Sequence, residues 1–136
     1  MAETAREYFE DVAEAVRQHR QAELILAFGP PRRGGAGAGI SDPVAARAAS
    51  DESARATMDA TEQRIGEGLR RIGELRRIFA RMADVVEMHY VDLMPWGDVA
   101  DEIGISRVTV IRWNNNIMDF IDQTGWAHLR NCGDGS

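Results

Sequence analysis

The residues best suited to molecular recognition lie in one short segment, 106–116, which reads "SRVTVIRWNNN". Arginine can bind guanine through two hydrogen bonds, asparagine can bind adenine, and valine or isoleucine can pack on thymine methyl groups. Serine and threonine can bind phosphate near a helix N-terminus, where free N–H groups and the helix dipole favour anions. The segment therefore predicts a surface that binds double-stranded DNA.

Two short helices joined by a tight turn would position these side chains. Pro95 suits the first turn of a helix, and Gly104 is expected to end that helix in a left-handed conformation. Ile105 would fill the space between the helices, and Ser106 is a good N-cap for the second helix. The inward side of the first helix would then consist of Trp96, Val99, Ala100 and Ile103. This spacing favours a helix-turn-helix, although short helix pairs with glycine turns are also common packing units.

The outward face of the second helix follows once its inward residues are fixed. Helical spacing turns Val110, Trp113, Ile117 and Phe120 or Ile121 inward. The predicted DNA-binding residues are then Ser106, Arg107, Val108, Thr109, Ile111, Arg112, Asn115 and Asn116.

The preceding elements also have helical patterns. Apolar residues recur at helical spacing over 1–28, which predicts an amphipathic N-terminal helix. Prolines and glycines then interrupt the chain over 29–43 and predict a flexible linker. That linker closes with "SDP", a start signal with Ser41 or Asp42 as N-cap and Pro43 at the first helical position.

A long helix is predicted over 44–90, where apolar residues recur every seventh position from Met58 to Val86. Gly66, Gly68 and Gly73 would each weaken it by roughly 1 kcal/mol. We therefore expect a break near residue 50 or a bend near 66–73. The apolar stripe fits an intrachain helical hairpin or a dimer contact equally well. The predicted fold is all-α, a long helical hairpin or arm followed by a helix-turn-helix domain over 91–130 and a disordered tail over 131–136.

Charge is distributed unevenly along the chain, which has a formal net charge of −6. An acidic balance opposes indiscriminate binding to DNA. Arginines concentrate over 62–81, whereas acidic residues dominate over 82–136. A basic face would thus combine the 62–81 helix with a few C-terminal arginines, unless those arginines only solvate an amphipathic helix.

Several function classes find no support in the sequence. No apolar run is long enough for a membrane span, the N-terminus lacks a secretory leader, and Cys132 is the single cysteine, so we expect a cytoplasmic protein. His19, His89 and His128 are too dispersed to bind a metal. The "RRGGAGAG" segment lacks the lysine of a phosphate-binding loop. We expect neither an enzyme nor a cofactor or metal site.

Longer stretches resemble known proteins. "HYVDLMPWGDVADEIGISRVTVIRW" resembles the promoter-reading fourth region of bacterial sigma factors. Residues 35–127 resemble phage transcriptional regulators of the RinA/ArpU type through "GISDP", "VVEMHYVDLMPWGDVADEIGIS" and "TVIRWNNNIMDFIDQTGW". The resemblance implies a small DNA-binding protein that switches on phage late or packaging genes. It also implies that Arg107, Val108, Ile111 and Arg112 contact bases, although sigma-like recognition helices usually carry polar residues at the positions of Val108 and Ile111.

The leading hypothesis is therefore a sequence-specific transcription regulator that dimerises or contacts RNA polymerase through its N-terminal helices. Two arginines on one helix predict weak binding by a single copy, which makes a homodimer part of the hypothesis. The alternatives are a small terminase-like DNA-packaging subunit, which would form rings, and a sigma-like module that acts through protein contacts alone.

Overall fold

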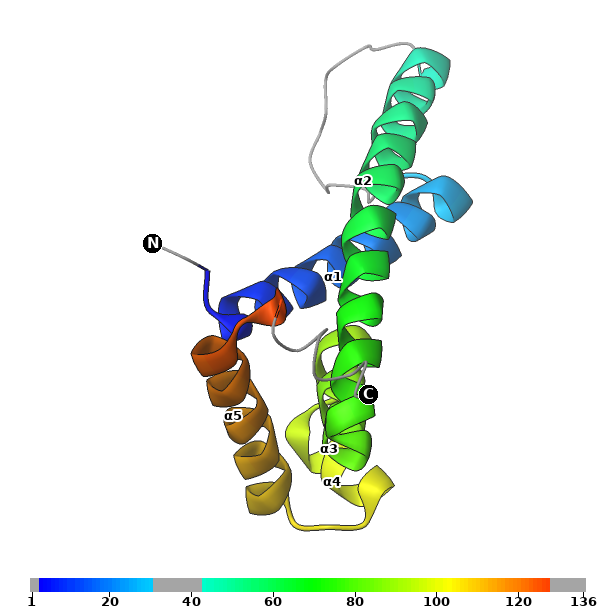
Figure 1. Cartoon of the computed structure of the whole chain (residues 1–136). Coiled ribbons are helices and arrows are strands. Elements are labelled where there is room, and N and C mark those ends of the chain that lie inside the picture. Colours follow the sequence, from blue (N-terminus) through cyan, green and yellow to red (C-terminus); the bar gives the residue numbers. More distant parts are fainter. Residues whose placement is uncertain (1–2, 31–42, 128–136) are drawn as a thin grey trace.

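The computed structural model describes residues 3–30 and 43–127, and within these ranges every regular element is helical. In chain order the elements are α1 (Ala5–Phe28), α2 (Pro43–Ile78), α3 (Ala80–Val86), the π-helical turn η1 (Glu87–Val91), α4 (Trp96–Ile103) and α5 (Arg107–Thr124). The predicted all-α class is confirmed (Figure 1). The expectations for linker residues 31–42, including the N-cap at Ser41 or Asp42, and for the tail 131–136 lie outside the described residues.

The first helix begins later than its apolar pattern predicts, because a capping box fixes its start. The Thr4 hydroxyl accepts a hydrogen bond from the N–H of Glu7 at 3.1 Å, and the Glu7 carboxylate accepts one from the N–H of Thr4 at 3.4 Å. Two N–H groups without intrahelical partners are thereby satisfied. At the other end, Gly29 follows Phe28 with a left-handed φ of 86° and ends the helix.

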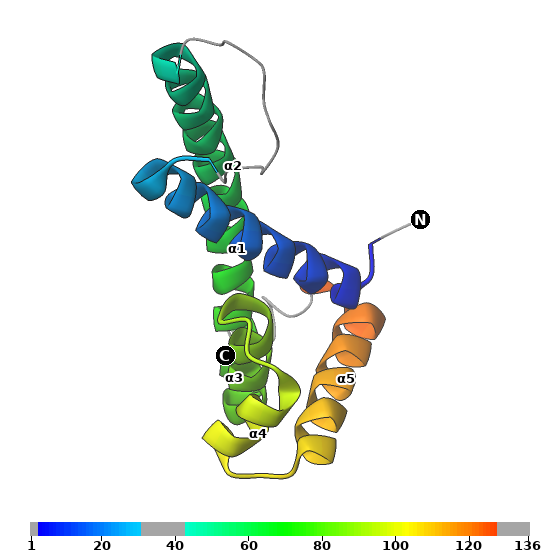
Figure 2. The same cartoon turned by 180° about the vertical axis from the view of Figure 1, so that it is seen from behind.

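Helix α1 packs across the middle of α2 within the same chain (Figures 1 and 2). Phe9 and Val12 of α1 are fully buried in one cluster with Ile72 and Leu75 of α2. Gly68 permits the close approach, because a Cβ atom there would lie 3.0 Å from both methyl groups of Val12. Of the two alternatives for the apolar stripe, the structure contains the intrachain packing.

The long helix predicted over 44–90 is interrupted at Phe79, and neither residue 50 nor the 66–73 region breaks it. Phe79 has φ −125° and ψ 62°, and the chain then folds back as α3 beside the end of α2. The Phe79 ring packs edge to face against Phe120 of α5, with 5.0 Å between centroids. Arg76 bridges the reversal through Asp84 at 2.9 Å and Glu87 at 3.3 Å. Tertiary packing thus sets the break at Phe79. The glycines at 66–73 do not end the helix, because a single glycine costs too little to interrupt a packed helix.

Two apolar clusters hold the C-terminal helices in place. The larger joins α1, α2, α3, η1 and α5 around Phe9, Ile72, Val86 and Ile117. Trp126, just beyond α5, packs against this cluster, with its ring centroid 5.7 Å from Tyr8 and 5.9 Å from Phe9. The smaller cluster joins α3, α4 and α5 and consists of buried Val85, Val99, Ala100 and Val110. The α4–α5 pair therefore shares a small core with α3 and rests on a scaffold built by α1, α2, α3 and η1.

None of the helices in the described ranges has the length and apolar character that crossing a membrane requires.

Candidate nucleic-acid interface

The turn between α4 and α5 has the geometry expected from Gly104 and Ser106. Gly104 is left-handed, with φ 84° and ψ 31°, and its N–H donates to the carbonyl of Ala100 at 2.8 Å. Ser106 is the N-cap of α5, and its hydroxyl oxygen accepts a hydrogen bond from the N–H of Thr109 at 3.2 Å. Both predictions are confirmed. The turn is therefore short and fixed at each end by a specific backbone contact.

The packing beneath the turn fixes which face of α5 points outward. Val110 is fully buried against Val99 and Ala100 of α4. Ile105, in the turn, is half-buried in the same cluster. The side of α5 that is opposite Val110 consequently faces away from the protein.

The structure exposes five of the eight predicted DNA-binding residues: Ser106, Arg107, Val108, Arg112 and Asn116. Thr109, Ile111 and Asn115 are half-buried, so the predicted outward face is too wide. Thr109 contributes its hydroxyl to the helix cap, 2.8 Å from that of Ser106. Asn115 accepts a hydrogen bond from Arg6 of α1 at 2.8 Å. The exposed face therefore concentrates on the first half of α5 together with Asn116.

Val108 is the one large apolar residue of α5 that is well exposed, at 65% of its surface. It lies four residues before Arg112, so the two side chains are neighbours on the same face. Among the described residues, the guanidinium groups of Arg107 and Arg112 have no hydrogen-bond, ion-pair or ring partner. This face combines an apolar group with two available cations.

Asn114 is an interior residue that the sequence interpretation missed. It is only 1% exposed, and its amide donates to the Tyr90 hydroxyl at 3.2 Å. The signal was present in the helical phase, because residue 114 falls four after Val110 and three before Ile117. Its place within a run of three asparagines concealed that phase.

Helix α1 docks directly on α5, a contact that the sequence did not predict. The backbone N–H of Ala5 donates to a carboxylate oxygen of Asp122 at 2.7 Å. With the Arg6–Asn115 hydrogen bond, this contact covers one flank of the second half of α5. On this flank α1 therefore leaves only the first half of α5, from Arg107 to Arg112, open to a partner.

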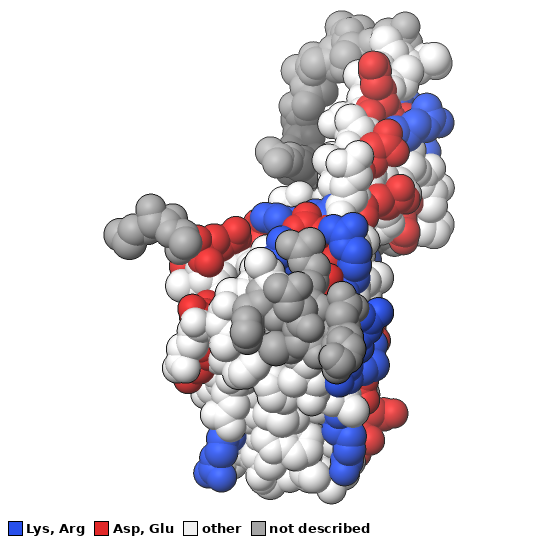
Figure 3. All heavy atoms as spheres, in the orientation of Figure 1, with Lys and Arg blue, Asp and Glu red and all other residues white. Residues whose placement is uncertain are grey.

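The arginines of α2 do not extend the basic surface of α5. Figure 3 shows basic surface along the α2 side of this face and a separate basic patch near the start of α5, with a mostly uncharged surface between them. Several of the α2 arginines are also neutralised in place. Arg64 pairs with Asp11, Arg71 with Glu67 at 3.2 Å, and Arg76 with Asp84 and Glu87. The predicted basic face that combines the 62–81 helix with the C-terminal arginines is not confirmed for Arg107 and Arg112, because the view in Figure 3 separates the basic surface of α2 from that of α5, and Arg130 lies outside the described residues.

Arg81, at the start of α3, reaches the α4–α5 pair. It donates to the carbonyl of Ile103 at 3.2 Å, at the end of α4. Its guanidinium also lies 6.0 Å from the ring centroid of Trp113 on α5. Arg81 thus ties the turn to the scaffold.

Comparisons with models of known protein families, with curated proteins and with solved structures find no match. In the described part of the chain, no three histidine, cysteine, aspartate or glutamate side chains are grouped as a metal site would require. The fold and the candidate interface thus define an all-α protein with an exposed helix face on a packed two-helix unit. The resemblance to phage regulators stays a prediction.

Proposed function

We propose that this protein is a sequence-specific DNA-binding transcription regulator and that α4 and α5 form its helix-turn-helix. The observation that carries the proposal is the exposed face of α5, where Val108 lies 65% exposed beside Arg112. Exposure of an apolar side chain to water is unfavourable in free energy, and contact with a thymine methyl group would bury the Val108 side chain. An adjacent arginine can bind guanine through two hydrogen bonds.

The first half of α5 would enter the major groove. Arg107, Val108 and Arg112 would contact base edges, and Asn116 would lie at the rim of the contact. Ser106 and Thr109 cap the helix, so phosphate binding near them would use the N–H groups at the start of α5. Asn115 would not contact bases, because Arg6 already occupies its side-chain oxygen.

A second copy of the protein would supply the remaining affinity. A single exposed face with two arginines offers few phosphate contacts, and phosphate contacts dominate affinity for DNA. Two apolar residues near the end of α1, Leu24 and Phe28, are 58% and 82% exposed and would serve as the contact between copies. By light scattering we expect a dimer that Phe28→Ser dissociates. A ring of eight or more copies would favour the packaging alternative.

The resemblance to RinA/ArpU-type regulators and to the fourth region of sigma factors supports the biological setting of this proposal. The protein would be a cytoplasmic, phage-derived activator of late or packaging genes that contacts RNA polymerase and has no catalytic activity. Transcription in vitro from a selected site, with and without the protein, tests the activator role.

The decisive experiment is selection of binding sites from random duplexes, followed by affinity measurements over a salt series. Arg112→Ala should lose roughly 1–3 kcal/mol at the selected site, which is about 5- to 150-fold in affinity. Arg55→Ala, a change of an exposed arginine on α2, is the matched control and should leave affinity unchanged. Binding that ignores sequence, or that is absent at about 50 mM salt, would contradict the proposal.

Val108 permits a sharper test of base contact. Replacing each thymine of the selected site with uracil removes one methyl group at a time. We expect one such change to weaken the wild-type protein and to have no effect on Val108→Ala. Equal effects on both proteins at every position would exclude a methyl contact through Val108.

A further inference from the structure

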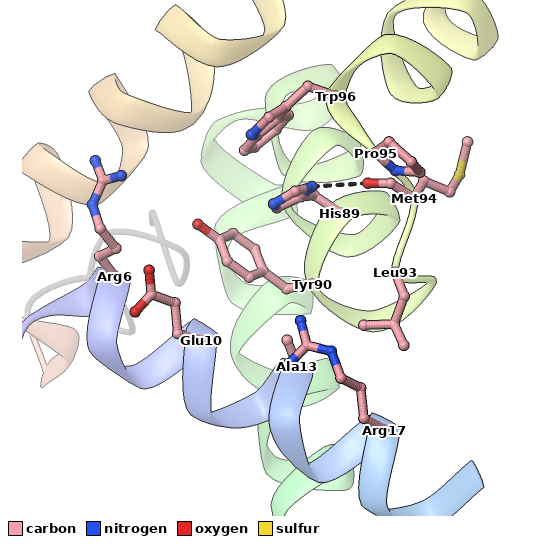
Figure 4. Close-up of a pocket in the computed structure, with 10 residues that line it drawn as sticks. All are labelled: Arg6, Glu10, Ala13, Arg17, His89, Tyr90, Leu93, Met94, Pro95 and Trp96. Atoms are coloured by element: carbon pink, nitrogen blue, oxygen red, sulfur yellow. Dashed lines mark hydrogen bonds between the residues drawn. The ribbon is translucent and has the colours of Figure 1, made fainter. Parts of the chain in front are cut away.

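A second candidate site lies between α1 and the segment that leads into α4, away from the exposed face of α5. It is an open hollow of about 590 Å³, a volume typical of small-molecule sites. Helix α1 lines one wall with Arg6, Glu10, Ala13 and Arg17. The facing wall runs from His89 to Trp96, and Figure 4 shows its aromatic side chains across from Arg6 and Glu10.

The wall opposite α1 is held in a strained conformation. Leu93 has φ 59°, in the left-handed region that costs a residue other than glycine roughly 1–2 kcal/mol. Two hydrogen bonds hold this loop, from the N–H of Met94 to the carbonyl of Met88 at 2.9 Å and between His89 and the carbonyl of Met94 at 2.8 Å. Such strain persists where the surrounding structure enforces it, and it concentrates at ligand sites.

The loop fixes the hydrogen-bonding character of His89. Because the Met94 carbonyl can only accept, Nδ1 of His89 carries the proton and Nε2 presents a lone pair. The imidazole stacks on Trp96, with 3.6 Å between centroids and 13° between ring planes. Burial lowers the pKa of His89, so the ring stays neutral near pH 7. The wall therefore offers an oriented acceptor beside a stacked aromatic pair.

The α1 wall offers an acceptor between two cations. The Glu10 carboxylate has no hydrogen-bond or ion-pair partner among the described residues. Arg17 pairs with Glu14 at 3.0 Å, but both side chains are more than half exposed and such pairs are weak. Arg6 uses one nitrogen for Asn115 and retains other donors. Glu10 and Arg17 are seven residues apart, which is about 10.5 Å along the helix.

These groups specify the chemistry of a ligand. A ligand that engages all of them donates N–H groups to Glu10 and His89 and carries an anionic group for an arginine. Guanine presents two adjacent N–H donors that match the two oxygens of a carboxylate, and a phosphate suits a guanidinium. We propose that this hollow binds a guanosine monophosphate, with Glu10 on the base edge, His89 and Trp96 beside the base, and Arg17 on the phosphate. A duplex cannot enter a hollow of this size, so the site is separate from the DNA-binding face.

The proposal is tested by calorimetric titration of the full chain, without DNA, with guanosine 5′-monophosphate, adenosine 5′-monophosphate and ribose 5-phosphate. We expect saturable binding of the guanosine nucleotide with a Kd below about 1 mM. The adenosine nucleotide should bind at least about tenfold more weakly, because its ring nitrogen would place a lone pair against Glu10.

Three exposed residues of α1 provide the variants. Glu10→Gln should abolish the preference for guanosine, and Arg17→Ala should weaken both nucleotides about tenfold. Arg20→Ala, an exposed residue of α1 that does not line the hollow, is the control and should bind as the wild type does. The proposal is overturned if no mononucleotide binds saturably, if Glu10→Gln leaves the preference intact, or if only oligonucleotides bind. Since the assay contains no DNA duplex, its outcome is independent of the proposed regulator function.

Discussion

The side-chain amide of Asn114 donates a hydrogen bond to the Tyr90 hydroxyl at 3.2 Å, in the interior between α5 and η1. Asn114 is 1% exposed and Tyr90 is 5% exposed. Burial raises the pKa of Tyr90, so its hydroxyl remains protonated over the physiological range. Buried polar groups are costly unless they are paired. This hydrogen bond satisfies the Tyr90 hydroxyl and the Asn114 amide nitrogen, whereas the Asn114 side-chain oxygen has no hydrogen-bond partner among the described residues, and the bond holds the predicted recognition helix at a defined rotation on the scaffold.

Replacing Asn114 with alanine should therefore destabilise the protein. The change leaves the Tyr90 hydroxyl without this partner and opens a small cavity, and together these should cost about 1–3 kcal/mol. The free energy of unfolding in urea measures the loss. Asn116→Ala removes the same side chain from the exposed side of α5 and should change stability by less than about 0.5 kcal/mol. Equal losses in the two variants would show that the buried hydrogen bond is unimportant.

The glycines of α2 should respond oppositely to alanine, depending on what faces them. At Gly73 a Cβ atom would meet nothing within 4 Å, so Gly73→Ala should stabilise the protein by about 0.5–1 kcal/mol through helix propensity. At Gly68 the new Cβ atom would lie 3.0 Å from both methyl groups of Val12, a fully buried residue. Overpacking at this crossing should cost about 1–3 kcal/mol.

Thermal unfolding of the two glycine variants, measured in parallel, provides the readout. We expect the midpoint to rise for Gly73→Ala and to fall for Gly68→Ala. Val12→Ala in the Gly68→Ala background should restore part of the loss. If both glycine variants were more stable than the wild type, α1 would not pack on α2 at this crossing.

Local rules were sufficient for the parts of the fold that depend on one or two neighbouring residues. Gly104 and Ser106 were predictable because a left-handed helix end and an N-cap each require particular residue types. The all-α class followed from apolar periodicity over long segments. These features depend little on how distant elements pack.

Features that arise from packing between distant elements were not predictable. The break at Phe79 depends on its contact with Phe120, which is 41 residues further along the chain. The side-chain oxygen of Asn115 accepts a hydrogen bond from Arg6, and only the docking of α1 brings Arg6 to α5. The separation of the two basic patches in Figure 3 likewise depends on the relative orientation of α2 and α5. The hollow beside His89 exists only in the folded chain.

The N-cap of α5 can be tested separately from the rest of the interface. Ser106→Ala removes the hydroxyl that accepts from the N–H of Thr109 and should cost about 1 kcal/mol. Ser106→Asn retains a capping oxygen and should recover most of that loss. Chemical denaturation of both variants measures the difference. If alanine and asparagine were equivalent here, the cap would not stabilise α5.

His89 should make stability depend on pH in the range below neutrality. Burial lowers its pKa in the folded protein, and the nearby Arg17 lowers it further, whereas the hydrogen bond to Met94 opposes the shift. Well above pH 6.5, the pKa of an unperturbed histidine, His89 is neutral in both the folded and the unfolded states. Below that pH the unfolded chain takes up a proton that the folded protein resists, so stability falls as pH falls. The loss stops growing once the pH passes below the pKa of the folded state.

His89→Gln isolates this effect, because a glutamine amide can donate to the Met94 carbonyl but does not titrate. The free energy of unfolding should be measured for both proteins between about pH 7.5 and 5.5. Other charged groups contribute equally to the stability of the two proteins, and their contributions cancel in the difference. The exceptions are groups that interact directly with His89, namely Glu10, Arg6 or Arg17. We expect the wild type to lose stability relative to His89→Gln as the pH decreases. A difference that stays constant, or that changes in the opposite direction, would mean that the folded protein accepts a proton on His89 as readily as the unfolded chain.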